Sequence, residues 1–464
     1  MTRAAAPRRG TLRAVFRRIL IANRGEIARR IIRACDALGI ESVVVHSTAD
    51  ADMPFVREAT EAVCIGPARA AESYLDMEAI LQAAAQTESQ AIHPGYGFLA
   101  ENALFAQMVL QQRLAWIGPP PRVIRLMGEK SPAKDAMRAA GLPLVPGSGG
   151  LLDSLDEALE QADRIGYPVL LKADAGGGGK GMRRADSPDA LREAWVSARG
   201  EALASFGNDA VYLERYLTSG RHIEFQVLAD SWGNAVHLFE RECSIQRRHQ
   251  KLLEEAPSPA LSHEQRMAMG KRVADASAAI GYVGAGTVEF LQDPDSGELY
   301  FIEMNTRLQV EHPVTEEITG IDLVQAQIRI AAGEKLWFTQ DDLTITGHAI
   351  ELRINAEDPD DGFRPGPGLV SGLTPPTGDR VRWDAAVEQG TKISPYYDSM
   401  VAKLITWGPD RDAAIDRSLA ALDSLSVDGV PTTASLHKTI LGTDAFRAGD
   451  LRVGIIPGRP DLSD

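Results

Sequence analysis

The stretch Gly286–Val314, GTVEFLQDPDSGELYFIEMNTRLQVEHPV, constrains the fold most, because it combines a strand pattern with many reactive side chains. Two runs in which apolar residues alternate with others, Thr287–Leu291 and Leu299–Glu303, flank the turn-rich segment Asp293–Gly297. Alternation on both sides of such a turn is typical of a β-hairpin. The sequence therefore predicts two antiparallel strands here.

Glu289 and Glu303 face each other across this predicted hairpin. Like charges directly opposite each other destabilise an antiparallel pair, so two carboxylates among apolar neighbours need a reason. A divalent cation that prefers oxygen ligands, such as Mg²⁺, would supply it, and Asn305 adds a neutral oxygen. The alternative is a surface hairpin whose charges are only solvated.

Arg307, Gln309, Glu311 and His312 follow at once in a less regular segment. These side chains can handle an anion, so an anion-binding set stands directly beside a metal-binding set. The density of the cluster favours a functional site over a solvated hairpin.

Composition excludes several classes of protein. A chain of 464 residues, 44% hydrophobic and 24% charged, predicts a globular protein of about three domains. The formal net charge of −15 and the lack of a polybasic stripe argue against nucleic acid as a partner. No apolar run is long enough for a membrane span. Cys35, Cys64 and Cys243 have no metal-type spacing, which fits a reducing cytoplasm.

The segment before Ile19 contains several arginines and no acidic residue. An Arg-rich, acid-free start occurs in organelle transit peptides. It is also typical of a disordered tail, which we favour because the segment has little Ser and no clear amphipathic stripe.

Strands and helices alternate after this segment. A buried strand is expected at Ile19–Ala22, a helix with Ile27 and Ile31 on one face follows, and Gly39 ends it. A second strand at Ser42–His46 completes a β-α-β unit, so a parallel sheet is predicted. The fingerprint GxGxxG is absent after the first strand, which argues against NAD binding.

The segment His93–Leu99, HPGYGFL, follows a later predicted strand, where α/β proteins place ligand contacts. For this segment alone we favour a structural interpretation, a tight turn with an aromatic plug.

Four glycines, Gly176–Gly179, follow an apolar strand that carries Lys172. Their bare N–H groups can wrap a phosphate, with Lys172, Lys180 and Arg183 supplying positive charge. The Walker A pattern G-x-x-x-x-G-K-[ST] is not met. A mobile glycine hairpin that closes over a nucleotide fits better than a plain flexible linker, which would not be expected to have lysines on an apolar strand.

The run Glu240–Lys251 alternates charges over a short span, and a solvated face is the default expectation for such a run. Cys243 within it has no assigned base, so we do not favour it as a nucleophile. Further on, a helix is predicted at Gly320–Ala332, a strand at Gly347–Asn355 and, in a small final domain, a helix at Arg411–Leu425.

Together these motifs resemble those of the biotin carboxylases, the ATP-grasp components of biotin-dependent carboxylases. The resemblance extends from about Arg18 to about Arg447. It rests on the passages NRGEIARRIIRAC, HPGYGFLAEN, IGPPPRVIRLMG, GGGGKGMR, RECSIQRRHQK, EEAPSP, FIEMNTRLQVEHPVTE, LRINAED and YYDSMVAKLI.

The resemblance implies an α/β protein with the ATP-grasp fold, an N-terminal parallel α/β (pre-ATP-grasp) domain, a mobile glycine-rich lid and a C-terminal α+β domain. The expected boundaries are a disordered basic tail at 1–17, an N-terminal domain at 18–130, an ATP-grasp domain at 131–345 and a C-terminal domain at 346–464. The lid is expected at about 144–216 within the ATP-grasp domain.

The resemblance also implies the site residues. For ATP they are Lys172, Gly176, Gly177, Gly178, Gly179, Met182, Glu214, Leu217, His222, Gln246 and His249. For the metal they are Glu289, Glu303 and Asn305. For bicarbonate and biotin they are Lys251, Arg307, Gln309, the Val310 backbone and Arg353. The implied catalytic set is Glu311, as general base, with Arg353, Lys251 and Arg307.

The implied reaction is the carboxylation of biotin with ATP and bicarbonate through carboxyphosphate, the first half-reaction of an acetyl-CoA or other acyl-CoA carboxylase. The implied cofactors are ATP, Mg²⁺ or Mn²⁺, bicarbonate and carrier-bound biotin. The implied partners are a biotin carboxyl carrier protein, a second copy of the chain in a cytoplasmic homodimer, and a carboxyltransferase subunit.

The sequence departs from the family pattern at two places. Many members have a lysine where this chain has Pro120, and their glycine run is often five residues long, whereas Asp174 and Ala175 precede four glycines here. Carboxylases of the methylcrotonyl-CoA and propionyl-CoA kind also lack that lysine, so the acceptor acid is left open. No AMKM-like biotinylation motif occurs in the sequence, so biotin is expected to arrive on another protein, unless the chain is part of a longer polypeptide.

Two other functions stay open. One is an ATP-grasp ligase with a different acceptor, but Arg353 within LRINAED argues against it. The other is a catalytically silent subunit that organises a carboxylase complex, against which the complete set of metal and anion residues argues.

Overall fold

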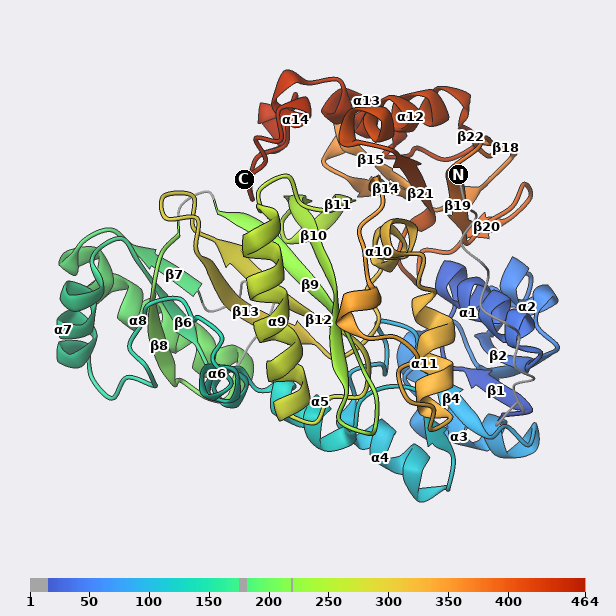
Figure 1. Ribbon diagram of the computed structural model, residues 1–464, viewed down its shortest axis with the longest axis horizontal. Helices are drawn as coiled ribbons and strands as arrows, with labels where there is room; N and C mark the ends of the chain where they lie inside the picture. Colours follow the sequence, from blue (N-terminus) through green and yellow to red (C-terminus); the bar gives the residue numbers. More distant parts are fainter. Residues whose placement is uncertain (1–15, 175–181, 218–219, 464) are drawn as a thin grey trace.

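The computed structural model describes residues 16–174, 182–217 and 220–463. The first unit, blue to cyan in Figure 1, contains a parallel sheet with the strand order β3-β2-β1-β4-β5. Its strands are β1 Arg18–Ile21, β2 Glu41–Ser47, β3 Glu61–Gly66, β4 Ala91–His93 and β5 Ala115–Trp116. Its helices are α1 Gly25–Leu38, α2 Pro54–Glu58, α3 Met77–Gln86, α4 Ala103–Gln111 and α5 Pro121–Gly128. The predicted parallel sheet is confirmed.

Helix α1 illustrates why this unit folds as its pattern predicts. Ile27 and Ile31 recur with the spacing of one helix face, and both are fully buried. Gly39 ends the helix in the left-handed conformation at φ 70°, where its N–H donates to the Asp36 carbonyl at 3.0 Å. The chain then turns directly into β2.

An antiparallel sheet of eight strands occupies the centre of the molecule (Figure 1), with the order β13-β12-β9-β10-β11-β14-β21-β19. Its strands are β9 Arg221–Ala229, β10 Ala235–Arg247, β11 Gln250–Ala256, β12 Gly284–Gln292, β13 Leu299–Asn305, β14 His348–Asn355, β19 Val381–Ala385 and β21 Met400–Gly408. The predicted hairpin is confirmed as β12 and β13, with Glu289 in register with Glu303.

The two faces of this sheet differ because β9 and β12 alternate apolar and polar residues. On one face Phe225, Val288 and Phe290 share a hydrophobic core with Val273 of helix α9 (His263–Ala279), which crosses the sheet in Figure 1. The intervening polar residues of β9 and β12 lie on the opposite face. The side chains of Glu289 and Glu303 are therefore directed away from α9.

The run Glu240–Lys251 corrects the expectation of a solvated face. It forms the end of β10 and the start of β11 inside the sheet, and both Glu240 and Arg241 are fully buried. Arg241 pairs with Glu224 at 2.6 Å and Glu240 pairs with Arg266 at 2.7 Å. These partners come from β9 and α9, outside the run, so charge alternation alone could not reveal them.

The lid, at the left of Figure 1, is built on a separate three-stranded sheet with the order β7-β6-β8. Its elements are β6 Val169–Ala173, β7 Met182–Ala185, β8 Val211–Arg215, α7 Leu155–Ile165 and α8 Pro188–Phe206, and α6 Lys130–Ala139 precedes them. Leu171, Trp195 and Leu213 belong to a hydrophobic core of its own. Lys172 pairs in register with Met182, so β6 and β7 form the sides of a hairpin.

Two helices, α10 His312–Thr319 and α11 Leu323–Ala331, follow the β12–β13 hairpin. Helix α11 confirms the predicted helix, with Leu323, Ala326 and Ile330 buried. The pattern did not predict α10, because polar and apolar residues alike are buried there and no stripe marks a helix face.

The C-terminal part continues the central sheet. Strand β14 pairs with β11 over Leu253–Ala256 on one side and with β21 on the other. A single hydrophobic core therefore includes Ile19 of β1, Leu253 of β11 and Leu404 of β21. The pairing of β11 with β14 crosses the boundary expected at 345/346.

Helices α12 Arg411–Ser424, α13 Ala434–Leu441 and α14 Asp444–Arg447 complete this part, and the predicted strand at Gly347–Asn355 and helix at Arg411–Leu425 are confirmed as β14 and α12. The short strands are β15 Glu357–Asp358, β16 Arg364–Pro365, β17 Gly368–Leu369, β18 Gly372–Thr374, β20 Lys392–Ile393 and β22 Ser426–Asp428. The short 3₁₀ helices are η1 Thr48–Asp50, η2 Ala70–Glu72, η3 Gln340–Asp342, η4 Pro359–Asp361 and η5 Pro460–Leu462.

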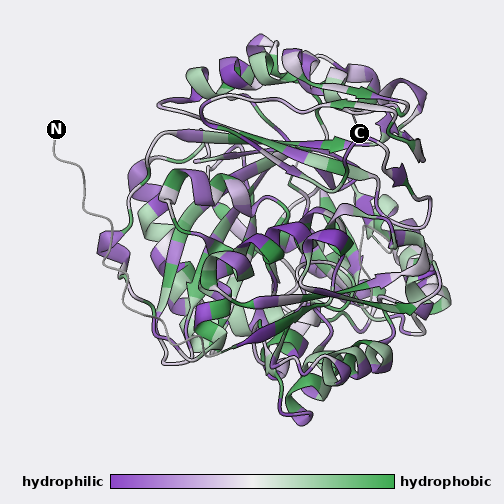
Figure 2. Ribbon diagram, turned by 90° about the vertical axis from the view of Figure 1, so that its right-hand side faces the viewer, coloured by the Kyte–Doolittle hydropathy of each residue, from purple (hydrophilic) through white to green (hydrophobic). Residues whose placement is uncertain are grey.

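Figure 2 shows helices at the outer surface in which hydrophilic and hydrophobic turns mix, as expected where one helix face meets the core and the other meets water. In the described part of the chain, every helix is too short or too polar to cross a bilayer.

Candidate active site

A cavity of about 1230 Å³ lies where the first unit, the lid, the central sheet and the C-terminal strands meet. The predicted residues that line it are Lys172, Met182, Glu214, Leu217, His222, Gln246, His249, Lys251, Glu289, Glu303, Asn305, Arg307, Gln309, Val310 and Arg353. Glu311 does not line it, because its side chain is fully buried behind Lys251 and Arg353. Gly176, Gly177, Gly178 and Gly179 lie outside the described residues.

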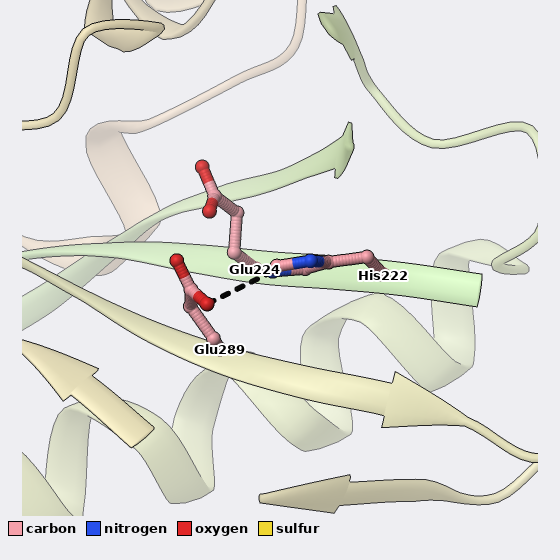
Figure 3. A group of neighbouring side chains, drawn as sticks. All are labelled: His222, Glu224 and Glu289. Carbon is pink, nitrogen blue, oxygen red and sulfur yellow. Dashed lines mark ion pairs between the residues drawn. The ribbon is translucent and has the colours of Figure 1, made fainter. Parts of the chain in front are cut away.

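A row of charged side chains crosses the sheet beneath this cavity. Strand registers place Glu303 opposite Glu289 and Glu289 opposite Glu224. On the far side, Arg241 lies opposite Glu224. Registered residues share one face of a sheet, so three carboxylates lie side by side. Figure 3 shows Glu224 on β9 and Glu289 on β12 rising from neighbouring strands.

Lys251 supplies the positive charge for this row. Its Nζ donates to Glu224 at 2.6 Å, to Glu311 at 2.7 Å and to Glu289 at 3.1 Å. Burial alone would lower the pKa of Lys251, but the three carboxylates outweigh it and hold that pKa well above its usual value. Lys251 is therefore a fixed cation at neutral pH.

His222 contacts the same carboxylate row from the other side. Its Nε2 lies 3.0 Å from Glu289 Oε2, the contact dashed in Figure 3. Burial would lower the pKa of His222, but the Glu289 charge raises it overall. In turn, burial would raise the pKa of Glu289, and Lys251 and His222 lower it. Glu289 is therefore ionised at neutral pH.

The donor set fits a hard divalent cation at Glu289 and Glu303. Glu303 forms no ion pair with any described residue, and its partial enclosure, together with the Glu289 charge, raises its pKa. A cation with oxygen ligands would relieve this repulsion. A second group of potential ligand atoms, from His222, Glu224 and Glu289, lies within 4.8 Å, but the Lys251 ammonium already contacts both of its carboxylates.

Asn305 holds Glu289 in place. Its Nδ2 donates to Glu289 Oε1 at 2.8 Å, and its Oδ1 accepts from Arg307 Nη2 at 3.1 Å. In this orientation its oxygen faces Arg307, so direct ligation of a metal would require the amide to turn.

Residues 306–311, without helix or strand, join β13 to α10 and are held by side chains. Arg307 Nε donates to Glu101 Oε2 at 2.8 Å, and Gln309 Nε2 donates to Glu289 Oε1 at 3.1 Å. Burial would lower the pKa of Arg307, but Glu101 raises it overall. The sequence did not identify Glu101, which comes from the first unit, more than 200 residues away.

Glu311 lies between two cations. Its Oε1 accepts from Lys251 at 2.7 Å and its Oε2 accepts from Arg353 Nη2 at 3.0 Å. Burial alone would raise the pKa of Glu311, but Lys251, Arg353 and the more distant Arg241 hold it well below its usual value. The carboxylate is therefore ionised at neutral pH and can accept a proton.

Arg353 has a second partner that sequence reasoning missed. Its Nη2 also pairs with Glu254, a fully buried residue of β11. Burial raises the pKa of Glu254 to about 7 although Arg353 opposes the shift, and the Glu311 charge adds to it. Glu254 lies within the passage EEAPSP. Nothing in that local pattern predicts an ion pair with Arg353, about a hundred residues later in the chain.

On the lid side, two lysines share the Glu214 carboxylate. Lys172 Nζ lies 2.5 Å from Glu214 Oε2, and Lys134 of α6, which the sequence did not identify, pairs with Oε1. Burial would raise the pKa of Glu214, but both lysines lower it.

Gln246 is buried and lines the cavity, whereas His249 is exposed at its edge. Arg248 and His249 form the two-residue turn between β10 and β11, with φ of 48° and 66°. This conformation costs a non-glycine residue about 1 kcal/mol or more and is held by its surroundings. The tight turn directs His249 toward the cavity.

The segment after β4 forms a turn at the wall of the cavity. Gly95 and Gly97 have φ of 62° and 69°, as the predicted tight turn requires. Tyr96, Gly97 and Phe98 also line the cavity, so the turn forms part of the cavity wall. Cys243, in contrast, is buried, and burial with the charge of Glu224 raises the pKa of its thiol well above the usual value, which disfavours a nucleophile.

Three family models match the chain. They are the N-terminal domain of biotin carboxylase over residues 15–124, the ATP-binding domain of the carbamoyl-phosphate synthase L chain over residues 129–339 and the C-terminal domain of biotin carboxylase over residues 351–457.

Relatives match over nearly the full length. The biotin carboxylase of Nostoc sp. is 55% identical over 441 residues, which cover 95% of this chain and 98% of the relative. The biotin carboxylase of Haemophilus influenzae is 54% identical over 95% of this chain and 98% of the relative. The biotin carboxylase domain dimer of Hydrogenobacter thermophilus 2-oxoglutarate carboxylase, solved with MgADP, ADP and bicarbonate, is 48% identical, with a TM-score of 0.90 and coverage of 97% of this chain and 99% of that chain.

Proposed function

The chain belongs to the biotin carboxylase family, and from that premise we propose how its residues carry out the reaction. The fold is the ATP-grasp biotin carboxylase fold, as the sequence predicted. The protein is a ligase that carboxylates biotin with ATP and bicarbonate through carboxyphosphate, the first half-reaction of a biotin-dependent carboxylase. Its cofactors are ATP, Mg²⁺, bicarbonate and biotin.

The position of Glu311 between Lys251 and Arg353 carries the proposed mechanism. Bicarbonate is an anion and a poor nucleophile, so it needs cations to hold it and a base to take its proton. Lys251 and Arg307, with Gln309 and the Val310 backbone, would hold bicarbonate at the cavity wall in front of Glu311.

Bound bicarbonate would also change the pKa of the proposed general base, Glu311. A second negative charge beside Glu311, and competition for its two cations, would raise the pKa of Glu311 from its low value. Glu311 then takes the bicarbonate proton while a bicarbonate oxygen attacks the γ-phosphorus of ATP. ADP leaves and carboxyphosphate forms.

We propose that Lys172, Met182 and Gly176–Gly179 bind the phosphates of ATP. Lys172 would offset the charge that spreads over the transferred phosphoryl oxygens. Glu289 and Glu303 would hold Mg²⁺, with Asn305 beside them, and the ion when bound would neutralise phosphate charge.

We propose that Arg353 interacts with biotin. Carboxyphosphate breaks down to CO₂ and phosphate, phosphate takes the proton of the ureido nitrogen, and that nitrogen attacks CO₂. Negative charge develops on the ureido oxygen, and the guanidinium of Arg353 would stabilise it by hydrogen bonds. The acceptor acid meets carboxybiotin only in the second half-reaction, so this cavity does not select it.

The test is bicarbonate-dependent ATP hydrolysis by the purified chain, with and without free biotin. Biotin should stimulate the wild type. Glu311→Gln should lower bicarbonate-dependent turnover by about 100-fold or more, because a general base contributes on that order. Arg353→Ala should abolish the stimulation by biotin.

The matched control is Arg411→Ala, which removes another arginine of a buried ion pair, 2.7 Å from Glu255, outside the cavity. It should keep biotin stimulation. Wild-type turnover that biotin does not stimulate would contradict the proposal, and so would full activity of Glu311→Gln.

We also propose the partners and the location. The biotin carrier is another protein or domain, a carboxyltransferase subunit completes the reaction, and the chain forms a homodimer, in keeping with the dimer of the Hydrogenobacter relative. A cytoplasmic location suits three cysteines without disulfides. The proposed domains are 18–130, 131–345 with a lid at about 144–216, and 346–464, after a basic tail at 1–17.

A further inference from the structure

A buried lysine of the C-terminal part reaches the wall of the cavity without lining it. Lys403 of β21 has no exposed side-chain surface, and its Nζ donates to the Val310 carbonyl at 2.7 Å. Among the hydrogen bonds of the described residues, this is the one that holds that carbonyl. Val310 stands between Gln309 and Glu311, within the segment proposed to hold bicarbonate.

Lys403 is held in turn by Glu26 of α1. The Lys403 Nζ lies 3.1 Å from Glu26 Oε1, and the Tyr96 hydroxyl donates to the same oxygen. Glu26, Tyr96 and Val310 all line the cavity. The pair therefore links the Val310 segment to the first unit and to the Gly-rich turn after β4.

The surroundings leave Lys403 little freedom. Strand registers place it beside Arg353 on β14 and Asp384 on β19, and Asp384 is already paired with Arg382. Glu26 keeps one carboxylate oxygen, Oε2, without a hydrogen-bond partner among the described residues. A buried ion pair is weak evidence for stability, because desolvation offsets much of the attraction. Its geometric effect is more specific, since it fixes a segment that has no helix or strand of its own.

Resting on the proposed function, we propose that Lys403 and Glu26 are positioning residues that fix the Val310 carbonyl, and with it the bicarbonate-holding segment, against the Tyr96 wall of the cavity. Neither residue transfers a proton or touches the phosphates. Losing the pair should therefore weaken bicarbonate and biotin use while ATP binding, which depends on the lid side, stays intact.

The experiment measures KM for ATP, bicarbonate and biotin, together with thermal stability, in two variants of the full chain. Lys403→Met removes the ammonium but keeps an unbranched side chain. The expected result is a rise of about 10-fold in KM for bicarbonate and biotin, because small misplacements of positioning groups cost that much or more. KM for ATP should stay within about twofold.

Glu26→Gln is the second variant, and it keeps the inference testable if Lys403→Met does not fold. Glutamine can still accept from the Tyr96 hydroxyl and only the charge is lost, so the same selective rise should be smaller. The double variant should be no worse than Lys403→Met, since both changes break one link.

The matched control is Arg266→Met. Arg266 is also buried, pairs with Glu240 at 2.7 Å and donates to backbone carbonyls, those of Ser258 and Leu261, but it does not line or support the cavity wall. It should lower thermal stability without changing any KM.

Unchanged KM values in Lys403→Met, a parallel rise for ATP, or an equal rise in Arg266→Met would each overturn the inference. Its failure differs from failure of the proposed function. In the latter case the wild type itself lacks biotin-stimulated ATP hydrolysis, whereas the inference is judged by a selective change in an active enzyme.

Discussion

At the scale of single residues, the site balances its charges around Lys251. One ammonium contacts three carboxylates: Glu289, for which we propose a metal role, Glu311, for which we propose a role toward bicarbonate, and Glu224 within the sheet. Moving any one of them changes the field at the other two. Single substitutions here should therefore alter several kinetic constants together, whereas Glu303, which has no described cation partner, offers a cleaner test.

Glu303→Gln should raise the Mg²⁺ concentration needed for half-maximal ATP hydrolysis by about 10-fold or more, because one charged ligand is lost while Lys251 and Glu289 keep their contacts. A titration of activity against Mg²⁺ at saturating ATP measures it. Glu298→Gln, an exposed residue of the same hairpin, is the control and should leave the titration unchanged. An unchanged titration in Glu303→Gln would exclude this residue from metal binding.

Most of the site residues that the sequence predicted do line the cavity, because the Gly286–Val314 cluster and the matching motifs come together there. Sequence reasoning missed Glu101, Lys134 and Glu254, whose roles arise only from contacts. Each is one charged residue without a local signal, and each pairs with a residue far along the chain. It also could not tell that Glu311 is shielded from the cavity.

At the scale of elements, periodicity succeeded where one face of a helix or strand is buried, as in α1 and in the β12–β13 hairpin. It failed for Glu240–Lys251, which lies in the middle of a sheet that is covered on both faces. Such strands can bury charged side chains when neighbouring elements supply residues of opposite charge. Periodicity also failed for α10, which is buried too completely to show a stripe.

Helix α10 connects the first unit to the C-terminal strands through Glu316. This carboxylate accepts from Arg30 of α1 at 2.7 Å and from Arg382 of β19 at 2.8 Å. Burial alone would raise the pKa of Glu316, but the two arginines lower it to about 2. A carboxyl group whose pKa falls on folding stabilises the protein above its unfolded pKa, and that stabilisation is lost as the pH falls from about 4.5 toward 2.

Glu316→Gln should therefore cost roughly 3 kcal/mol at pH 7, and progressively less as the pH falls below about 4.5. Thermal unfolding at pH 7 and at pH 3.5 measures the difference. Glu317→Gln is the control: that neighbour is more exposed and lies 3.4 Å from Arg382, so a much smaller effect is expected. A loss for Glu316→Gln that did not shrink in acid would contradict the pKa argument.

At the scale of the whole molecule, the central sheet extends across position 345/346, where the resemblance implied a domain boundary. Residues Leu253–Ala256 of β11 pair with Ala349–Leu352 of β14, and one hydrophobic core runs through both sides. The lid differs, since its core and its sheet are its own. A domain boundary implied by the resemblance does not indicate which strands share a sheet.

The fragment 346–464, produced alone, should lack a cooperative thermal transition, because β14 loses its partner β11 and exposes an apolar edge. Circular dichroism during heating measures it. Co-expression with the fragment 1–345 should restore the transition by re-forming the β11–β14 pairing. A cooperative transition of the isolated fragment would mean that the C-terminal strands form an independent unit.

The continuity of the sheet has a consequence for the protein during its synthesis. Lys172 and the β12–β13 hairpin leave the ribosome before β14 and β21, which carry Arg353 and Lys403. A growing chain therefore contains Lys172 and the hairpin while Glu311 still lacks its partner Arg353 and the Val310 carbonyl still lacks its partner Lys403. The contacts of Glu311 with Arg353 and of Val310 with Lys403 therefore form only when the last strands dock, so a partly synthesised molecule lacks a complete cavity wall.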